Sequence, residues 1–208
     1  MEFQTLKNDF RSNIYETSKS KKQGSAVLSV REEQIEVYDL DQLKDWFCEK
    51  YRNDQKLCSC DAYYQDTNNF LVMEFKNTHH LRIKEYISEI IVKIIDTHFL
   101  LAETFFSNRK ISKISSNVNM LLVYNDNLEY GTGVRRIGAA LNSIEPISGD
   151  TSRNSKEKDI YNNDDEFQRD VDLIKTKFEG DFYKSIEFVD KKDFMLDYIE
   201  PKYFSSLN

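Results

Sequence analysis

The chain lacks any run of apolar residues long enough to cross a bilayer, which takes about 20 residues in helical form. Its most apolar stretch, within 83–106, is interrupted by Lys93, Asp96 and Glu103. The first residues also lack the charged, apolar and small-residue order of a secretory signal peptide. These absences argue against a membrane partner and against export, and we expect a cytoplasmic protein.

Cysteine is scarce, with 3 residues, at Cys48, Cys58 and Cys60. An odd number without regular spacing does not indicate a disulfide framework, so we expect reduced thiols, as is usual in the cytoplasm. A zinc site would need further ligands, and His79 and His80 are the candidates. Their spacing from the cysteines fits no standard zinc-ligand pattern, so the sequence does not favour zinc.

Positive charge is in the minority, because 29 Lys and Arg side chains stand against 36 Asp and Glu, for a net charge of −7. This balance argues against a protein that coats nucleic acid with its whole surface. Residues 148–208 carry 10 basic and 15 acidic side chains, so most of the excess lies there. The acidic C-terminal region is therefore a candidate surface for a protein partner.

The length of 208 residues and the aromatic content of 13% indicate a chain that can bury a sizeable core. The polar, turn-rich region 146–165 is typical of a flexible loop or linker. We therefore predict an α/β core over 1–145 and a C-terminal extension over 166–208. The extension is expected to contain a helix and a strand that pack on the core.

The spacing of apolar residues predicts helices and strands along the whole chain. The expected elements are a helix over 2–17, a strand or hairpin over 27–37, a helix capped by Asp39 or Asp41 and ending near Tyr51, a hairpin over 61–76, a long helix over 81–106 capped by Thr78, a buried strand over 119–124, a helix restarting near Asp165, a strand over 184–189 and a short helix over 191–199. A strand, a long helix and a second strand favour a parallel pairing by right-handed crossover. The expected fold class is α/β (α+β), with a central mixed sheet flanked by helices.

The second strand of the hairpin places polar side chains on one face. Strand side chains alternate with a period of two, so Glu74 and Lys76 share a face. The opposite face carries Leu71, Met73 and Phe75. An acidic and a basic side chain forced side by side in this way are a candidate site.

The turn of the hairpin decides where Asp61 lies. A two-residue turn at 67–68 puts Asp61 opposite Glu74, whereas a turn at 68–69 puts it opposite Lys76. Either turn brings the three polar side chains to one face, and an odd-length loop would move Asp61 to the other face. Both two-residue registers stay open at this point.

Two carboxylates on directly paired positions have Cβ atoms about 4.5–5.5 Å apart, so they repel each other unless a cation lies between them. Hard oxygen ligands suit Mg²⁺ or Mn²⁺. Such an ion polarises a phosphoryl oxygen and generates hydroxide at neutral pH, which is what phosphodiester cleavage needs. Lys76, close to the ion, would hydrogen-bond to the attacking water or to the phosphate.

The helix expected after the hairpin adds candidates for substrate binding. Its first N–H groups, near Thr78, could point at an anion, and Arg82 and Lys84 in its first turns would add positive charge. His79 or His80 could contact substrate beside the lysine of the hairpin. These residues would bind a phosphate backbone.

The order of these residues and elements resembles the PD-(D/E)XK, or restriction-endonuclease-like, nuclease superfamily. The resemblance rests on Asp61, on Glu74-Phe75-Lys76 closing an apolar strand, on the long amphipathic helix and on the strand Leu121-Leu-Val-Tyr124. It covers about residues 1–125, read as helix, three-stranded meander, helix and strand. The contexts Cys60-Asp61-Ala62 and Met73-Glu-Phe-Lys-Asn77 are similar to bacterial proteins of that type, although Cys60 stands where the family pattern has proline.

The resemblance implies a restriction-endonuclease-like core and a hydrolase that cuts DNA with Mg²⁺ or Mn²⁺. The metal would be held by Asp61, Glu74 and the main-chain carbonyl of Phe75. Asp61, Glu74 and Lys76 would be the catalytic residues, and Lys76 would orient or activate water and offset charge on the phosphate. Glu16 is the candidate for the further acidic residue that such proteins often carry on their first helix.

Two other interpretations stay open. The same fold without catalysis would be a protein-interaction module that uses the acidic C-terminal region, and a homodimer is compatible with either form. In an unrelated α/β domain, Glu74 and Lys76 would be a solvated surface ion pair worth under about 1 kcal/mol. The order of elements favours the nuclease, acting as an endo- or exodeoxyribonuclease.

Overall fold

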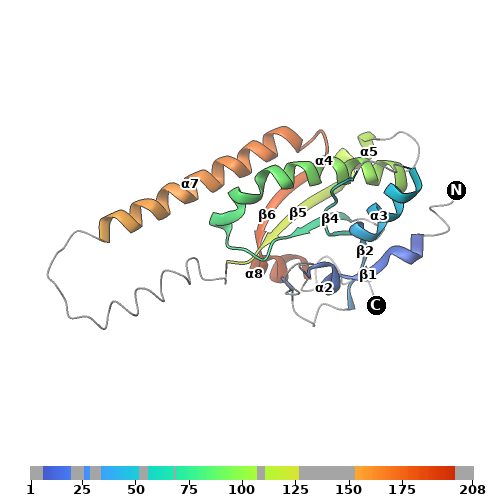
Figure 1. The fold of residues 1–208 in the computed structure, drawn as a ribbon, viewed down its shortest axis with the longest axis horizontal. Helices are drawn as coiled ribbons and strands as arrows, with labels where there is room; N and C mark the ends of the chain where they lie inside the picture. Colours follow the sequence, from blue (N-terminus) through green and yellow to red (C-terminus); the bar gives the residue numbers. More distant parts are fainter. Residues whose placement is uncertain are drawn as a thin grey trace.

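The computed structural model describes residues 7–19, 26–28, 34–51, 56–67, 69–106, 111–126 and 153–199, without the side chains of 111–113 and 153–163. These residues form a six-stranded mixed sheet with helices on both faces (Figure 1). The fold class expected from the sequence, α/β with a central mixed sheet, is confirmed at this level.

The strands follow one another across the sheet in the order of the chain. They are β1 (Arg11–Asn13), β2 (Glu36–Asp39), β3 (Ala62–Gln65), β4 (Phe70–Phe75), β5 (Val118–Tyr124) and β6 (Ser185–Asp190). The first four are antiparallel neighbours, whereas β5 lies parallel to β4 and β6 lies parallel to β5. The parallel pairing expected across the long helix is therefore confirmed.

Helices cover both faces of this sheet (Figure 1). The helical segments are η1 (Lys7–Phe10), α2 (Ile14–Thr17), α3 (Leu40–Tyr51), η3 (His80–Tyr86), α4 (Ile87–Thr104), α5 (Ile111–Asn117), α7 (Arg153–Phe178), α8 (Lys191–Phe194) and a π-helical turn, η4 (Met195–Ile199). Residues of α3, α4, α5 and α7 pack on one face, and residues of α2 and α8 pack on the other. Within the described ranges, no helix combines the length and the apolar character needed to cross a membrane.

Alternating strand residues feed two separate cores. Val72 of β4 and Leu122 of β5 face α4, and Met73 and Leu121 face α2 and α8. Because both faces are covered, β4 and β5 are nearly continuous runs of apolar residues. Full burial of each such side chain stabilises the fold by about 1.5–3 kcal/mol, so the two central strands are held from both sides.

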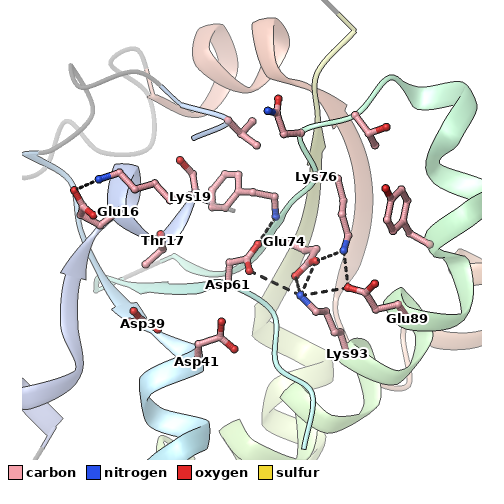
Figure 2. A pocket seen from close by; sticks show the side chains of 16 residues that line it. Glu16, Thr17, Lys19, Asp39, Asp41, Asp61, Glu74, Lys76, Glu89 and Lys93 are labelled. Atoms are coloured by element: carbon pink, nitrogen blue, oxygen red, sulfur yellow. Dashed lines mark hydrogen bonds and ion pairs between the residues drawn. The ribbon is translucent and has the colours of Figure 1, made fainter. Parts of the chain in front are cut away.

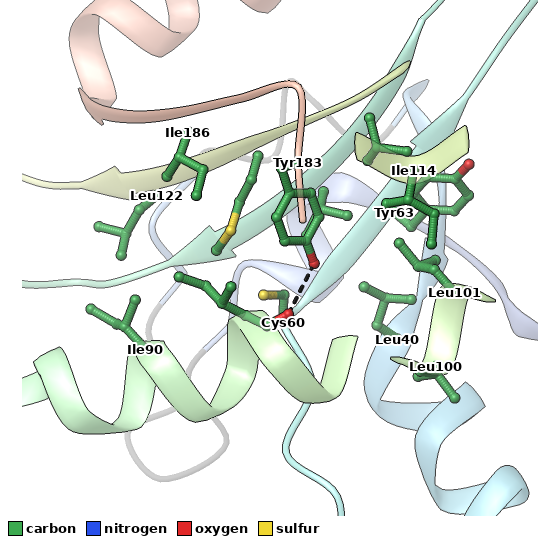
Figure 3. Packing of buried hydrophobic residues seen from close by; sticks show 14 of the residues in the cluster. Leu40, Cys60, Tyr63, Ile90, Leu100, Leu101, Ile114, Leu122, Tyr183 and Ile186 are labelled. Atoms are coloured by element: carbon green, nitrogen blue, oxygen red, sulfur yellow. Dashed lines mark hydrogen bonds between the residues drawn. The ribbon is translucent and has the colours of Figure 1, made fainter. Parts of the chain in front are cut away.

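The larger core lies between the sheet and α4 (Figure 3). Ile90, Ile94 and Leu101 project from one side of α4 into this core and are almost completely buried. Tyr183, from the loop before β6, is also fully buried, and its hydroxyl donates a hydrogen bond of 3.2 Å to the carbonyl of Ile94. This contact ties the last third of the chain to α4.

Several predicted boundaries agree with the structure. Asp39 caps α3, since its carboxylate accepts the main-chain N–H of Gln42 at 2.9 Å. The hairpin and the strands predicted over 119–124 and 184–189 lie where the apolar pattern predicts them, the two strands as β5 and β6. The three cysteines are free thiols, of which Cys60 is buried.

The helix predicted over 2–17 is broken in its described part. Lys7–Phe10 and Ile14–Thr17 are short helical segments, but Arg11–Asn13 between them is a strand that pairs with β2. The carboxamide of Asn13 accepts the N–H of Glu16 at 2.8 Å and so starts a new helix. Pairing with β2 therefore overrides the helical spacing of Phe10 and Ile14, and residues 2–6 lie outside the described ranges.

The strand predicted over 27–37 is also shorter than expected. Val27 and Leu28 are buried but belong to no strand, and β2 begins only at Glu36. An apolar pair can be buried by packing under the sheet without pairing at its edge. Residues 29–33, in the middle of the predicted strand or hairpin, lie outside the described ranges.

Thr78 does not begin the long helix. Its N–H donates to the carbonyl of Lys76 in a turn, and its own carbonyl accepts the N–H of Asn125 at 2.9 Å. The chain is thus tied to the end of β5 before a helix can form. His79 caps η3, and regular α-helix begins only at Ile87.

The loop predicted over 146–165 is wrong from Arg153 onward, because α7 begins there; residues before 153 lie outside the described ranges. The apolar spacing of this helix starts late. Phe167, Val171, Ile174 and Phe178 recur at helical intervals and pack against the core. The polar first turns of α7 carried no such signal.

Two buried tyrosines give a matched test of the core. The Tyr63 hydroxyl is buried and has no hydrogen-bond partner among the described residues, whereas Tyr183 donates to α4. Removing an unsatisfied buried hydroxyl relieves a desolvation cost, so Tyr63→Phe is expected to raise the free energy of unfolding by about 1 kcal/mol. Tyr183→Phe is expected to lower it by about 1 kcal/mol. Urea denaturation measures both, and equal losses would contradict this account of the core.

Candidate functional site

The register of the β3–β4 hairpin places two carboxylates side by side. Ala62 pairs with Met73, so the next position brings Asp61 beside Glu74. This is the register of a two-residue turn at 67–68, and the alternative turn at 68–69 is wrong. Asp61 and Glu74 therefore reach the same face of the sheet, the one covered by α4.

Main-chain and helix contacts hold the two carboxylates at the end of the sheet (Figure 2). One oxygen of Asp61, Oδ2, accepts the N–H of Phe75 at 2.6 Å. The other, Oδ1, lies 3.8 Å from Nζ of Lys93. Glu74 is only 1% exposed, which is rare for a carboxylate unless it is paired.

Two lysines pair with the buried Glu74. Nζ of Lys93, from α4, lies 2.8 and 2.9 Å from its two oxygens. Nζ of Lys76, from the end of β4, lies 3.0 Å from Oε1 of Glu74 and 2.7 Å from Oε1 of Glu89. The hairpin and α4 are thus joined by one network of charges.

Burial and charge shift the protonation of this network. Burial raises the pKa of Asp61, and the negative charge of Glu74 raises it further, more than Lys93 and the N–H of Phe75 lower it. Burial alone would lower the pKa of Lys93, but attraction to Glu74 and then to Asp61 leaves that pKa raised. The pKa of Lys76 is raised in the same way, with Glu74 again the main opposing charge. Both ammonium groups therefore stay protonated at neutral pH.

A cavity of about 750 Å³ adjoins this network (Figure 2). Six carboxylates and three lysines of the described residues line it: Glu16, Asp39, Asp41, Asp61, Glu74, Glu89, Lys19, Lys76 and Lys93. They come from α2 and the residues just after it, the start of α3, the hairpin and α4. Even with Asp61 protonated, which its raised pKa favours, five carboxylates face three lysines, so the cavity attracts a cation more strongly than a phosphate.

The structure brings together the residues predicted for the metal and for catalysis. Asp61, Glu74, Phe75 and Lys76 all line the cavity, and so does Glu16. The alternative in which Glu74 and Lys76 form a solvated surface pair is wrong, since these side chains are only 1% and 12% exposed.

The residues predicted for substrate binding lie elsewhere. Arg82 pairs with Glu85 at 2.9 Å, and Lys84 pairs with Glu166 of α7 at 2.8 Å. His79 caps η3. None of these three is among the described residues that line the cavity. The late start of the helix explains this, because η3 turns the chain toward α7 before α4 begins.

Glu89 and Lys93 are residues of the network that the sequence did not predict. Lys93 was expected only as an interruption of the apolar stretch within 83–106, and no role was expected for Glu89. The signal was present, since the two residues are four apart and each adjoins a buried isoleucine, Ile90 or Ile94. Side chains on the border of an apolar stripe reach the edge of the surface that the helix covers.

The donor set fits a hard divalent cation. A single position, that of Nζ of Lys93, contacts both oxygens of Glu74 and approaches Oδ1 of Asp61. Two carboxylates that converge on one cationic centre offer the oxygen ligands that Mg²⁺ and Mn²⁺ prefer. The main-chain carbonyl of Phe75 belongs to the same strand end.

A second cluster lies where the chain leaves β5. His79, His80 and Asp126 offer ligand atoms within 4.8 Å of one another, a spacing that could hold a metal ion. Hydrogen bonds occupy these atoms, however. Nδ1 of His80 lies 2.8 Å from Asp126, and Nε2 lies 2.9 Å from Asp164 of α7. Nδ1 of His79 accepts the N–H of Leu81 at 3.3 Å, which puts the proton of a neutral ring on the Nε2 that faces Asp126.

His80 therefore links α7 to the segment after β5, through its contacts with Asp164 and Asp126. Burial would lower its pKa, but hydrogen bonds to Asp164 and then to Asp126 leave the pKa raised above 6.5. His79 shows the opposite shift, because burial lowers its pKa more than Asp126 raises it. The surroundings of His80 therefore favour its charged form, and those of His79 favour its neutral form.

No family model matches the chain, and neither a curated protein nor a solved structure matches it either. The geometry of the cavity and its charges is thus the ground for a functional interpretation.

Glu74→Ala tests whether the network is buried and coupled. It leaves two lysines with no carboxylate at the centre, so the free energy of unfolding is expected to fall by about 3–5 kcal/mol. Glu89→Ala is the control, because it removes a partner of the same Lys76 at a site that is 48% exposed. Its expected cost is under about 1 kcal/mol. Urea denaturation compares the two, and a small effect of Glu74→Ala would contradict the buried network.

The histidine pair predicts two opposite pH dependences of stability. The folded pKa of His80 is raised, so its stabilising effect is full below its ordinary pKa of 6.5 and is lost as pH rises through the folded value. The difference in unfolding free energy between the parent protein and His80→Gln is therefore expected to shrink above pH 6.5.

His79→Gln is the control for this measurement. The folded pKa of His79 is lowered, so its contribution is present above 6.5 and is lost as pH falls through the folded value. Urea denaturation from about pH 5 to 8 separates the two variants. Differences that move in the same direction for both variants would contradict the assigned charges.

Proposed function

We propose that this protein is a Mg²⁺- or Mn²⁺-dependent nuclease that hydrolyses phosphodiester bonds in DNA in the cytoplasm. The observation that carries the proposal is the convergence of Asp61 and Glu74 on one cation position beside Lys76. Burying two neighbouring carboxylates costs folding free energy, so such a pair beside a cavity favours a functional site.

The arrangement of elements supports the same proposal. An antiparallel meander, β2 to β4, is followed by α4 and by a strand parallel to β4. The resemblance to PD-(D/E)XK nucleases implies this order, and we propose a restriction-endonuclease-like core on that basis. The cavity lies at the C-terminal end of β4, the edge of a parallel pair at which α/β proteins commonly bind ligands.

The residues divide the chemistry between them. Asp61, Glu74 and the main-chain carbonyl of Phe75 would hold the metal, which when bound polarises a phosphoryl oxygen and acidifies water. Lys76, on the same strand, would orient that water for attack on phosphorus and hold charge that develops on the phosphate. The phosphorus–oxygen bond opposite the attacking water would then break. The attacking water would release one proton to solvent, and the leaving oxygen would take one proton from solvent.

The acidic lining makes binding of DNA dependent on the metal. Asp39, Asp41 and Glu16 repel a phosphate backbone from the cavity as long as no cation offsets them. A divalent ion at the carboxylate pair would supply that charge. Metal and DNA are therefore expected to bind together rather than independently.

A second candidate function has its own support. Lys76 and Lys93 already neutralise Glu74 from within the protein, as in a site that needs no metal. Asp164, Asp165 and Glu166 on α7 are exposed and acidic. A catalytically inactive member of the same fold could use that acidic surface to bind a basic protein partner.

Cleavage assays with plasmid, linear and single-stranded DNA in Mg²⁺ or Mn²⁺ separate these functions. The nuclease is expected to cut in the presence of metal and to lose at least about 100-fold of its rate in Asp61→Asn and in Lys76→Met. Lys177→Met is the control, because it removes an exposed lysine in the last turn of α7.

One result would contradict the proposed site, and another would contradict the nuclease. DNA cleavage that survives both Asp61→Asn and Lys76→Met would show that the cleavage site lies elsewhere. A folded protein that cuts none of these substrates with either metal would favour the inactive interaction module instead.

A further inference from the structure

The ammonium group of Lys93 lies where a metal ion bound by both Asp61 and Glu74 would lie. It lies 2.8 and 2.9 Å from the two oxygens of Glu74 and 3.8 Å from Oδ1 of Asp61. The Lys93 side chain is only 16% exposed, so water screens its attraction to these carboxylates only weakly. A divalent ion that used the same oxygens would have to occupy nearly the same point.

Lys76 differs from Lys93 in this respect. Its ion pairs among the described residues are with Glu74 at 3.0 Å and with Glu89 at 2.7 Å, and not with Asp61. Lys93 is therefore the lysine that bridges the two predicted metal ligands, whereas Lys76 stands beside them. Both carry one positive charge and both are mostly buried, which makes them a matched pair for experiments.

We propose that Lys93 is the resident cation of this site, that it holds Asp61 and Glu74 together when no metal is bound, and that a divalent cation enters by displacing its ammonium group. This inference rests on the metal pair of the proposed nuclease. It assigns Lys93 the role of a positioning residue that controls when the site is loaded.

Glu89, which already lies within ion-pair distance of Lys93, offers the displaced ammonium group a second carboxylate. It lies one turn before Lys93 on α4, and its Oε1 is 3.8 Å from Nζ of Lys93. Its carboxylate is 48% exposed, so it can take a second lysine without burying a further charge. Because both residues lie on α4, we expect a rotation of the lysine side chain to bring the two charged groups closer. The ammonium group then stays at the mouth of the cavity, where a phosphate would pass.

The displacement has a measurable consequence. A site that is competent only when Lys93 has moved away binds metal with an affinity reduced by the fraction of molecules in that state. Removal of the Lys93 charge must therefore tighten metal binding. Removal of the Lys76 charge relieves only the general positive field and should have a smaller effect.

Binding of Mn²⁺ to the full chain, followed by the loss of its free electron paramagnetic resonance signal, tests this without any substrate. Lys93→Met is expected to bind Mn²⁺ about 10-fold or more tightly than the parent protein. Lys76→Met, which removes the same charge from the same carboxylate, is expected to gain about 3-fold or less. Lys93→Arg keeps the charge and is expected to stay close to the parent affinity.

Equal gains in Lys93→Met and Lys76→Met would overturn the proposal, since they would show only a general field effect. An unchanged or weaker affinity in Lys93→Met would overturn it as well. If that variant does not fold, nuclear magnetic resonance of lysine side-chain nitrogens in the parent protein decides. Mg²⁺ is expected to shift the Nζ signal of Lys93, identified by its absence in Lys93→Arg, more than that of Lys76, and the reverse would refute displacement.

The outcome is distinguishable from the fate of the nuclease proposal. Tighter Mn²⁺ binding in Lys93→Met without DNA cleavage by the parent protein would support the resident cation and reject the nuclease. Cleavage that depends on Asp61 together with unaltered Mn²⁺ affinity in Lys93→Met would do the reverse.

Discussion

A carboxylate buried at the end of a central strand requires a cation beside it, and Glu74 has two. It is 1% exposed, and Lys76 and Lys93 contact it from the hairpin and from α4. An unpaired charge at this depth would be far too costly to keep ionised. The position of α4 over the sheet, the burial of the hairpin end and the charge of the cavity all depend on this pairing.

The same pairing gives the site two possible states. In the structure, the ammonium groups of Lys76 and Lys93 neutralise Glu74. In the proposed nuclease, a hard divalent ion would instead bind the oxygens of Asp61 and Glu74. A purely structural ion pair would need no cavity, yet a cavity with excess negative charge adjoins this one. The two proposals, a metal-dependent nuclease and a lysine that holds its metal site, follow from that combination.

Much of the site could be predicted from local pattern. Strand alternation placed Glu74 and Lys76 on one face, and the length of the turn placed Asp61 with them. Glu89 and Lys93 could not be placed in the same way, because their part depends on how α4 is rotated against the sheet. The start of α4 was also misplaced. The N–H of His80 donates to Asp126 and the carbonyl of Thr78 accepts the N–H of Asn125, so the chain is tied to the segment after β5 and regular α-helix begins only at Ile87.

The sequence by itself determined the mixed α/β class, the central apolar strands and the hairpin with its three polar side chains, because these follow from periodicities of two and of 3.6 over short distances. The tertiary structure alone decided that Arg11–Asn13 is a strand, that Arg82 and Lys84 are not among the described residues lining the cavity and that Lys93 bridges the carboxylates. Those outcomes depend on contacts between segments far apart in the chain, whose balance of pairing and burial no local pattern contains.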